Sequence, residues 1–70
     1  MVEIKLSNGQ VIKMRKPKVR DMRMVADVDN DVEKEMKLIG NLTNLTFDEL
    51  DEMDLDDYKK LQEALMGFLS

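Results

Sequence analysis

The chain has 70 residues, with 11 Lys and Arg, 15 Asp and Glu, and neither His nor Cys, so its formal net charge is −4. It therefore lacks the commonest general base, the commonest zinc ligands and any disulfide. These absences exclude Ser-His-Asp hydrolases, zinc hydrolases and disulfide-stapled folds. At this length we expect one small domain, residues 1–70, with a small core that a partner or self-association would stabilise.

The start of the chain predicts a β-hairpin. Apolar and charged residues alternate over residues 2–6, which is the pattern of a half-buried strand. The dipeptide Asn8-Gly9 suits the two positive-φ positions of a type I′ turn, and apolar residues return over residues 10–15. Pro17 ends the second strand because it has no N–H to donate. Neither a signal peptide nor a membrane-spanning run is expected here.

Two helices are expected next, over about residues 19–28 and 31–43. Asn30 can cap the second helix, with Glu33 at its third position. Apolar residues recur at helical spacing in both segments. In the first helix they are Val19, Met22, Val25 and Val28. In the second helix they are Val32, Met36, Ile39 and Leu42.

Two more helices are expected near the end of the chain, over about residues 47–53 and 55–69. Thr46 and Glu49 have the spacing of a capping box, and Asp54 with Asp57 repeats it. The last helix has an amphipathic stripe of apolar residues. They are Tyr58, Leu61, Leu65 and Phe68. The predicted fold is therefore α+β, with a hairpin at about residues 2–15 followed by three to four short helices.

Seven Met in 70 residues is a high number. The thioether side chain is flexible and polarizable, so it serves either as filler in a core or as an adaptable contact surface. We expect most of these side chains to be in the core. Met22, Met36 and Met53 fall on the stripes expected to be buried, whereas Met14, Met24 and Met66 are freer to face outward.

Charge is unevenly distributed along the chain. Residues 1–23 hold seven basic side chains against Glu3 and Asp21, a net charge of +5. The remaining 47 residues hold four basic and 13 acidic side chains, a net charge of −9. The chain is therefore bipolar, which would permit head-to-tail association between copies.

The acidic residues suggest two kinds of site, and neither is favoured. Asp27, Asp29 and Asp31 match the first three ligand positions of a calcium-binding EF-hand loop, but Val32 and Leu38 occupy the positions that need Gly and Glu. The acidic run between residues 48 and 57 offers paired carboxylates for catalysis, yet a short chain has little room for a substrate pocket. Helix capping explains both groups better. We expect no enzyme, no catalytic residue, no metal and no cofactor.

The basic stretch from Lys13 to Arg23 could bind phosphates, because electrostatics dominates non-specific affinity for nucleic acids. No aromatic residue is interleaved with it, and the isoelectric point is near 4.7. A protein-facing basic patch is therefore the favoured interpretation. A small nucleic-acid-binding regulator is the alternative.

Several short motifs resemble a known family. The stretch Arg15-Lys16-Pro17 with Asp21 is similar to an "R-x-P-x-x-x-D" motif of small tail assembly chaperones of Mu-like and P2-like contractile-tailed bacteriophages. The segment Leu38-Ile39-Gly40-Asn41-Leu42-Thr43 and the block Leu55-Asp56-Asp57-Tyr58 resemble that family's later pattern, an "L-D-x-x-D-Y" block, although the spacing of the block departs from it. The resemblance spans nearly the whole chain.

The resemblance implies a non-catalytic protein of a phage or prophage that acts in the cytoplasm of the bacterial host and is absent from the mature virion. It implies that the protein binds the tape measure protein, and also the tail tube protein, while the tube is assembled. We expect an amphipathic domain with adaptable side chains to cover apolar faces of such a partner, with no role for a membrane. The residues expected to contact the partner are Arg15, Lys16, Lys18, Arg20, Arg23, Leu65, Met66, Phe68 and Leu69.

Overall fold

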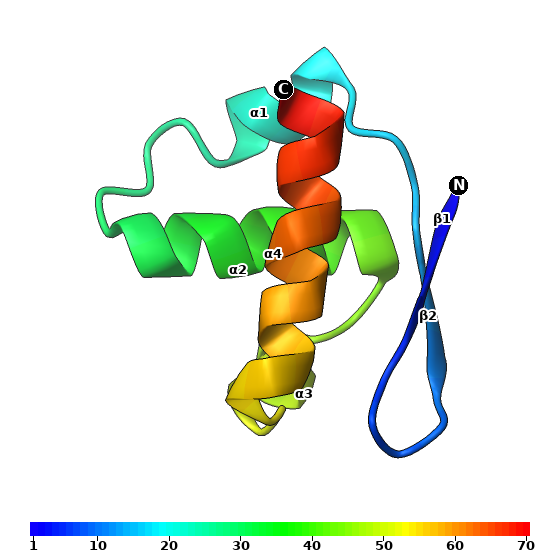
Figure 1. Ribbon diagram of the computed structural model, residues 1–70. Coiled ribbons are helices and arrows are strands. Elements are labelled where there is room, and N and C mark those ends of the chain that lie inside the picture. The colour runs from blue at the N-terminus through cyan, green and yellow to red at the C-terminus, as the bar shows by residue number, and fades with distance from the viewer.

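The computed structural model describes all 70 residues and has a β-hairpin followed by four helices (Figure 1). The α+β prediction is therefore confirmed. The strands are β1 (Val2–Lys5) and β2 (Val11–Met14). The helices are α1 (Val19–Met24), α2 (Asp31–Thr43), α3 (Phe47–Asp51) and α4 (Leu55–Leu69).

The hairpin has the predicted strands, each slightly shorter than expected, but a different turn. The Leu6 N–H donates to the Gln10 carbonyl at 2.8 Å, and the Gly9 N–H donates to the Leu6 carbonyl at 3.0 Å. The loop therefore has three residues, and only Gly9 adopts a positive φ, +88°. The predicted type I′ turn needs two such residues, so it is wrong. The Asn8 side chain instead accepts the Gln10 N–H at 2.9 Å, which suits a residue with negative φ.

Helix α1 is shorter than the predicted segment 19–28. After Met24 the helical hydrogen bonds give way to turns with bonds between residues three apart. In one of them the N–H of Val28 donates to the carbonyl of Val25 at 3.1 Å. β-branched and Asp residues are weak helix formers, and both are frequent here. Of the predicted apolar stripe only Val25 is in the core, whereas Val19 is exposed.

Helix α2 confirms the predicted bounds 31–43. The Asn30 side chain accepts the Glu33 N–H at 3.0 Å, and Asn44 ends the helix in the left-handed conformation with φ of +62°. The predicted apolar face is buried except at Val32, which lies in the first turn, at the end of α2 away from the hairpin (Figure 1). The buried residues of α2 are Met36, Leu38, Ile39 and Leu42.

Helix α3 ends before the predicted residue 53, and α4 confirms the predicted bounds 55–69. The capping box at the start of α3 is also confirmed. The Glu49 N–H donates to the Thr46 hydroxyl at 3.1 Å, and the Thr46 N–H donates to the Glu49 carboxylate at 2.9 Å. The second capping box is wrong, because Asp54 makes no side-chain cap and Asp57 instead binds the hairpin turn.

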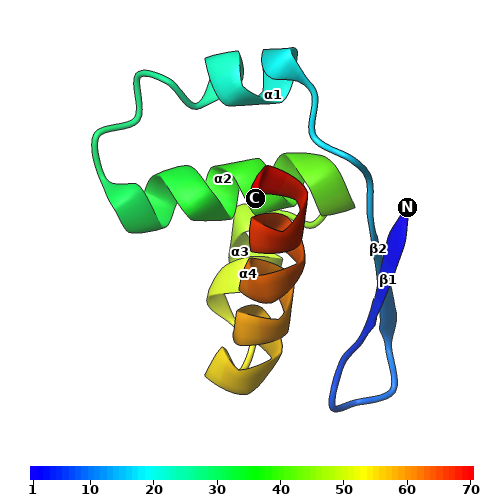
Figure 2. The same ribbon diagram turned by 45° about the horizontal axis from the view of Figure 1, so that its top comes forward.

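One cluster of 12 buried apolar residues connects the hairpin with the helices. In Figure 1 α4 crosses in front of α2, and the hairpin stands beside α4 at the C-terminal end of α2. In Figure 2 α1 lies above α2, whereas α3 and α4 lie below it. Polar contacts add to the packing of α4 on α2, since the Tyr58 hydroxyl and the Gln62 side-chain amide each donate to Glu35 at 2.8 Å. None of the helices is both long enough and apolar enough to cross a membrane.

The methionines are distributed differently from the prediction. Met14 is fully buried. The neighbouring Arg15 N–H donates to Leu42 at the end of α2, and this bond holds the end of β2 against the core. Met22 is exposed, since α1 turns only Asp21 toward the interior and the buried Val25 follows the helix. The expectation that most methionines lie in the core is therefore wrong. The exposed ones are Met1, Met22, Met24 and Met66.

Candidate partner-binding surfaces

Arg15, expected to contact a partner, is engaged inside the molecule. Its guanidinium donates to both carboxylate oxygens of Asp21, at 2.9 and 2.6 Å, and to the carbonyl of Asn41 at 3.3 Å. Asp21 is 1% exposed and also accepts the Lys18 N–H at 2.7 Å. The Arg15 hydrogen bonds, with that of Lys18, lower the pKa of Asp21 to about 2. The pair anchors α1 to the end of β2.

The remaining basic residues of the predicted site form one exposed surface with apolar neighbours. We call it the α1 surface, and its residues are Lys16, Lys18, Val19, Arg20, Met22, Arg23 and Met24. Val19 is 78% exposed, Met22 43% and Met24 53%. The helical spacing of the apolar residues predicted that Val19 and Met22 would be buried, so these exposed apolar side chains were not expected. Because Asp21 is buried against Arg15, the exposed charges of α1 itself are all positive.

The predicted residues at the end of α4 divide into two groups. Leu65 is buried and Phe68 is partly buried against the core, so these two side chains hold the helix in place. Met66 is 66% exposed and Leu69 53% exposed. We call Met66 and Leu69 the α4 end. The amphipathic stripe of the sequence already separates the groups, because Leu65 and Phe68 lie on it and Met66 and Leu69 do not.

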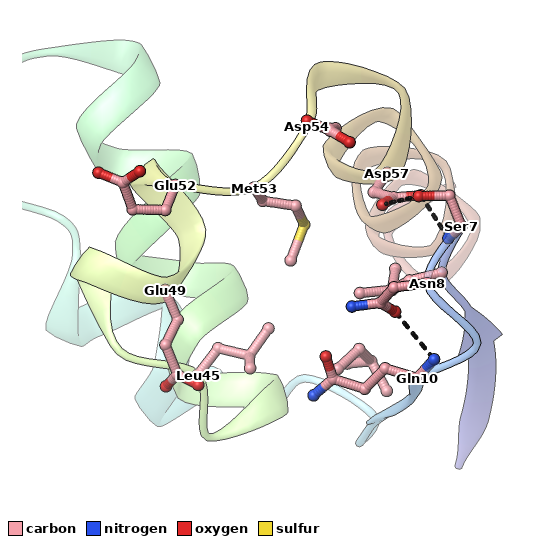
Figure 3. Close-up of a pocket in the computed structure, with 11 residues that line it drawn as sticks. Ser7, Asn8, Gln10, Leu45, Glu49, Glu52, Met53, Asp54 and Asp57 are labelled. Carbon is pink, nitrogen blue, oxygen red and sulfur yellow. Dashed lines mark hydrogen bonds between the residues drawn. The ribbon is translucent and has the colours of Figure 1, made fainter.

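A second carboxylate, Asp57, fastens the hairpin turn to the start of α4. It accepts the Ser7 N–H at 2.9 Å and the Ser7 hydroxyl at 2.8 Å (Figure 3). Lys60 Nζ lies 3.5 Å from the Asp57 carboxylate. The Ser7 hydrogen bonds lower the pKa of Asp57. Asp57 is only 5% exposed, so its two donors satisfy a carboxylate that solvent barely reaches.

A cavity of about 310 Å³ lies between this turn and the corner of α3 and α4. Figure 3 shows Glu49, Glu52, Asp54 and Asp57 around it, with the amides of the turn opposite. Two of these carboxylates already have structural partners, since Asp57 binds Ser7 and Glu49 caps α3. The corner is therefore a negatively charged surface, whereas the α1 surface is positively charged.

The three Asp residues of the Asp-rich loop do not gather into one cluster in the structure. Asp27, Asp29 and Asp31 are all exposed, and no group of three or more carboxylates in the structure is placed to hold a metal ion. Asp31 instead lies in the first turn of α2, where an acid interacts favourably with the helix dipole.

Comparison with known protein families identifies the family of this chain. The family model described as "Phage tail assembly chaperone proteins, E, or 41 or 14" matches residues 8–70, which is nearly the whole chain. The chain belongs to this family of phage tail assembly chaperones. No curated protein and no solved structure matches it. The resemblance found in the sequence motifs is thereby confirmed.

The matched range includes almost every feature of this chaperone described above. Ser7 stands just before it, whereas Arg15, Asp21 and Asp57 fall within it, as do the α1 surface and the α4 end. The "R-x-P-x-x-x-D" motif has a structural meaning here, because its Arg15 forms the ion pair with the buried Asp21. Pro17 lies between them, in the chain that turns from β2 into α1.

Proposed function

We propose that this chaperone binds the tape measure protein and keeps it soluble while the tail tube assembles. Membership of the family over residues 8–70 carries the proposal. The α1 surface supports it, because exposed methionines adapt to varied apolar partners and positive charges steer an acidic one. The work is reversible contact without catalysis, performed in the cytoplasm of the bacterial host by a protein that is absent from the mature virion.

Contact with the partner is assigned to the α1 surface and the α4 end. Several copies along one long partner would gain avidity, because each further contact becomes intramolecular. The tail tube protein is the second partner in this proposal. Copies of the chaperone could also associate, since the α1 surface is positive and the corner of α3 and α4 is negative.

Co-expression with the tape measure protein of the same phage or prophage tests the proposal. We expect the wild-type chain to raise the soluble amount of that protein and to co-purify with it. The double variant Met22→Asp and Met24→Asp should lower the co-purified amount at least tenfold, because both side chains are exposed and apolar. Val32→Asp is the matched control, an exposed apolar residue outside the α1 surface. Equal recovery with all three chains would contradict the role of the α1 surface.

The α4 end is tested in the same way with Met66→Asp and Leu69→Asp. Both residues are more than half exposed, so the fold should be retained while the contact is lost. Undiminished solubility and co-purification would remove the α4 end from the proposed site. Absence of any interaction between the wild-type chain and the tape measure protein would overturn the proposed function itself.

The basic side chains of the α1 surface also favour a second candidate, a nucleic-acid-binding regulator. Binding to duplex DNA at about 0.1 M salt that weakens as salt rises would support it. Lys18→Glu with Arg20→Glu should then abolish the binding. The neighbouring reading frames offer an independent test, since a tail tube gene upstream and a long tape measure gene downstream would support the chaperone.

A further inference from the structure

The outer edge of β2 carries backbone groups that bind nothing else in the molecule. Leu6 and Gln10 form a hydrogen-bonded pair at the turn, and such pairs recur at every second residue of an antiparallel ladder. Val11 and Lys13 therefore direct their N–H and C=O groups away from β1. Neither residue makes a hydrogen bond outside the hairpin ladder. The edge offers two donors and two acceptors to another strand.

One backbone group at each edge of the hairpin is bonded to another part of the molecule. On β2 the Arg15 N–H donates to the carbonyl of Leu42 at 3.0 Å, which closes the edge beyond Lys13. On β1 the Nζ of Lys60 donates to the carbonyl of Lys5 at 3.3 Å. Natural proteins usually cover sheet edges, because an open edge pairs with other chains. The uncovered part of β2 is thus confined to the stretch between the turn and Arg15.

A groove of about 440 Å³ lies beside this stretch, between β2 and the C-terminal end of α2. Its apolar lining residues are Met1, Val11, Ile12, Leu42 and Leu45. Its charged lining residues are Lys13 and Arg15, and Arg15 is neutralised by Asp21. Lys13 has no ion-pair partner. The groove therefore combines apolar walls with one unpaired positive charge.

We propose that the edge of β2 binds an extended, acidic and apolar segment of a partner protein as a third strand. Backbone hydrogen bonds to Val11 and Lys13 would hold the segment. Side chains alternate along a strand, so apolar residues at every second position enter the groove and an Asp or Glu lies beside Lys13. The inference goes beyond the proposed function, which concerns the α1 surface and the α4 end, and does not depend on it.

A second copy of the hairpin fits this edge less well. Antiparallel pairing of two β2 strands about Ile12 would place two Lys13 side chains on adjacent strands. Glu3 lies opposite Lys13 in the ladder but makes no ion pair with it. A segment carrying Asp or Glu removes this repulsion and gains an ion pair. Charge thus favours an acidic partner over self-association at this site.

A blocked peptide tests the proposal directly, acetyl-Thr-Val-Asp-Val-Glu-Val-Thr-amide, titrated into the full chain. At saturation we expect amide hydrogen exchange at Val11 and Lys13 to slow at least tenfold, because both amides become hydrogen-bonded. The same peptide with Lys in place of Asp and Glu should bind at least tenfold more weakly. Unchanged exchange at Val11 and Lys13 at millimolar peptide would overturn the proposal.

Two proline variants separate the two edges. The N–H groups of Glu3 and Lys13 both point outward from the ladder, so neither Glu3→Pro nor Lys13→Pro removes a bond between β1 and β2. Lys13→Pro should lower peptide affinity at least tenfold, whereas Glu3→Pro leaves the edge of β2 intact and should not lower it. Lys13→Gln keeps the N–H and should lose only the part of the affinity that depends on charge. Equal affinity of wild type and Lys13→Pro would contradict strand addition.

A chemically synthesised chain with N-methylated Val11 keeps the test valid if Lys13→Pro does not fold. It removes one edge donor without changing a side chain, and we expect the same tenfold loss of peptide affinity. Amide hydrogen exchange at Val11 and Lys13 that slows as the protein concentration rises, without peptide, would mean that a second copy of the chain binds this edge. That result would overturn the proposal.

Discussion

Asp21 and Asp57 are both buried carboxylates that fasten the hairpin, yet they do so with different partners and over different distances along the chain. Asp21 lies six residues from Arg15 and binds a cation through two hydrogen bonds. Asp57 lies 50 residues from Ser7 and binds a neutral hydroxyl and a backbone N–H. A two-pronged contact between opposite charges is stronger than hydrogen bonds in which only the acceptor is charged. The Asp21 contact therefore anchors α1 locally, and the Asp57 contact joins the beginning of the chain to its last helix.

Acid should produce the largest effect, because it acts on both carboxylates at once. The pKa of Asp21 is about 2 against an ordinary value of 3.8, and the pKa of Asp57 is also lowered. A folded-state pKa below the unfolded one gives stability that is complete above the unfolded pKa and is lost as pH falls through the folded value. We expect urea midpoints to fall steadily below pH 4. Asp21→Asn should show a shallower fall, and equal slopes would contradict the assignment.

Asp21→Ala should have the next largest effect and breaks the local contact alone. The change removes the acceptor of three hydrogen bonds and leaves Arg15 without its partner. Hydrogen bonds to charged groups contribute about 1.5 to 3 kcal/mol, so we expect a loss of roughly 2 kcal/mol in the free energy of unfolding. Urea denaturation at pH 7 measures it. Asp27→Ala, at an exposed Asp of the following loop, is the control and should change stability little.

Ser7→Ala should have a smaller effect and tests the long-range contact. It removes the hydroxyl donor, while the backbone N–H at residue 7 still binds Asp57. One hydroxyl donor to a carboxylate contributes about 1.5 kcal/mol, the lower end of the range for hydrogen bonds to charged groups. If the contact holds the turn on α4, amide exchange at Gly9 and Gln10 should also become faster in this variant. A stability loss as large as that of Asp21→Ala would contradict the ranking of the two contacts.

Lys60→Ala should have the smallest effect. Lys60 lies 3.5 Å from Asp57 and its side chain is 46% exposed, so the ion pair is screened by water. We expect a change within about 0.5 kcal/mol, measured by urea denaturation at low and high salt. A larger, salt-dependent loss would mean that the cation, and not Ser7, supports Asp57.

Helices α2 and α4 followed from the sequence because their signals are local. Asn30 and Glu33 lie within one turn, and apolar residues repeat at the helical period up to Leu69. The same logic failed for Asp57, whose spacing from Asp54 matches a capping box. Its carboxylate binds Ser7, which is 50 residues away, and no local pattern contains that partner.

Only the part of the candidate site that depends on neighbouring residues in the sequence was predicted. The basic charge of the segment from Lys16 to Arg23 was evident from composition, since four of its eight side chains are Lys or Arg. The sequence did not reveal which apolar residues lie beside these charges, because α1 ends early and turns Val19 and Met22 outward. The open edge of β2 was also invisible, since it depends on which strand positions the neighbouring helices cover.

The sequence by itself determined the order of elements, the long helices, the bipolar charge and the family, because each follows from residues close together in the chain. Only the tertiary structure decided that Arg15 works inside the molecule while Val19 and Met22 face outward. The physical reason is that burial and hydrogen-bond partners depend on elements far apart in sequence. A side chain's type limits what it can contact, and the packing of the whole chain selects the contact it makes.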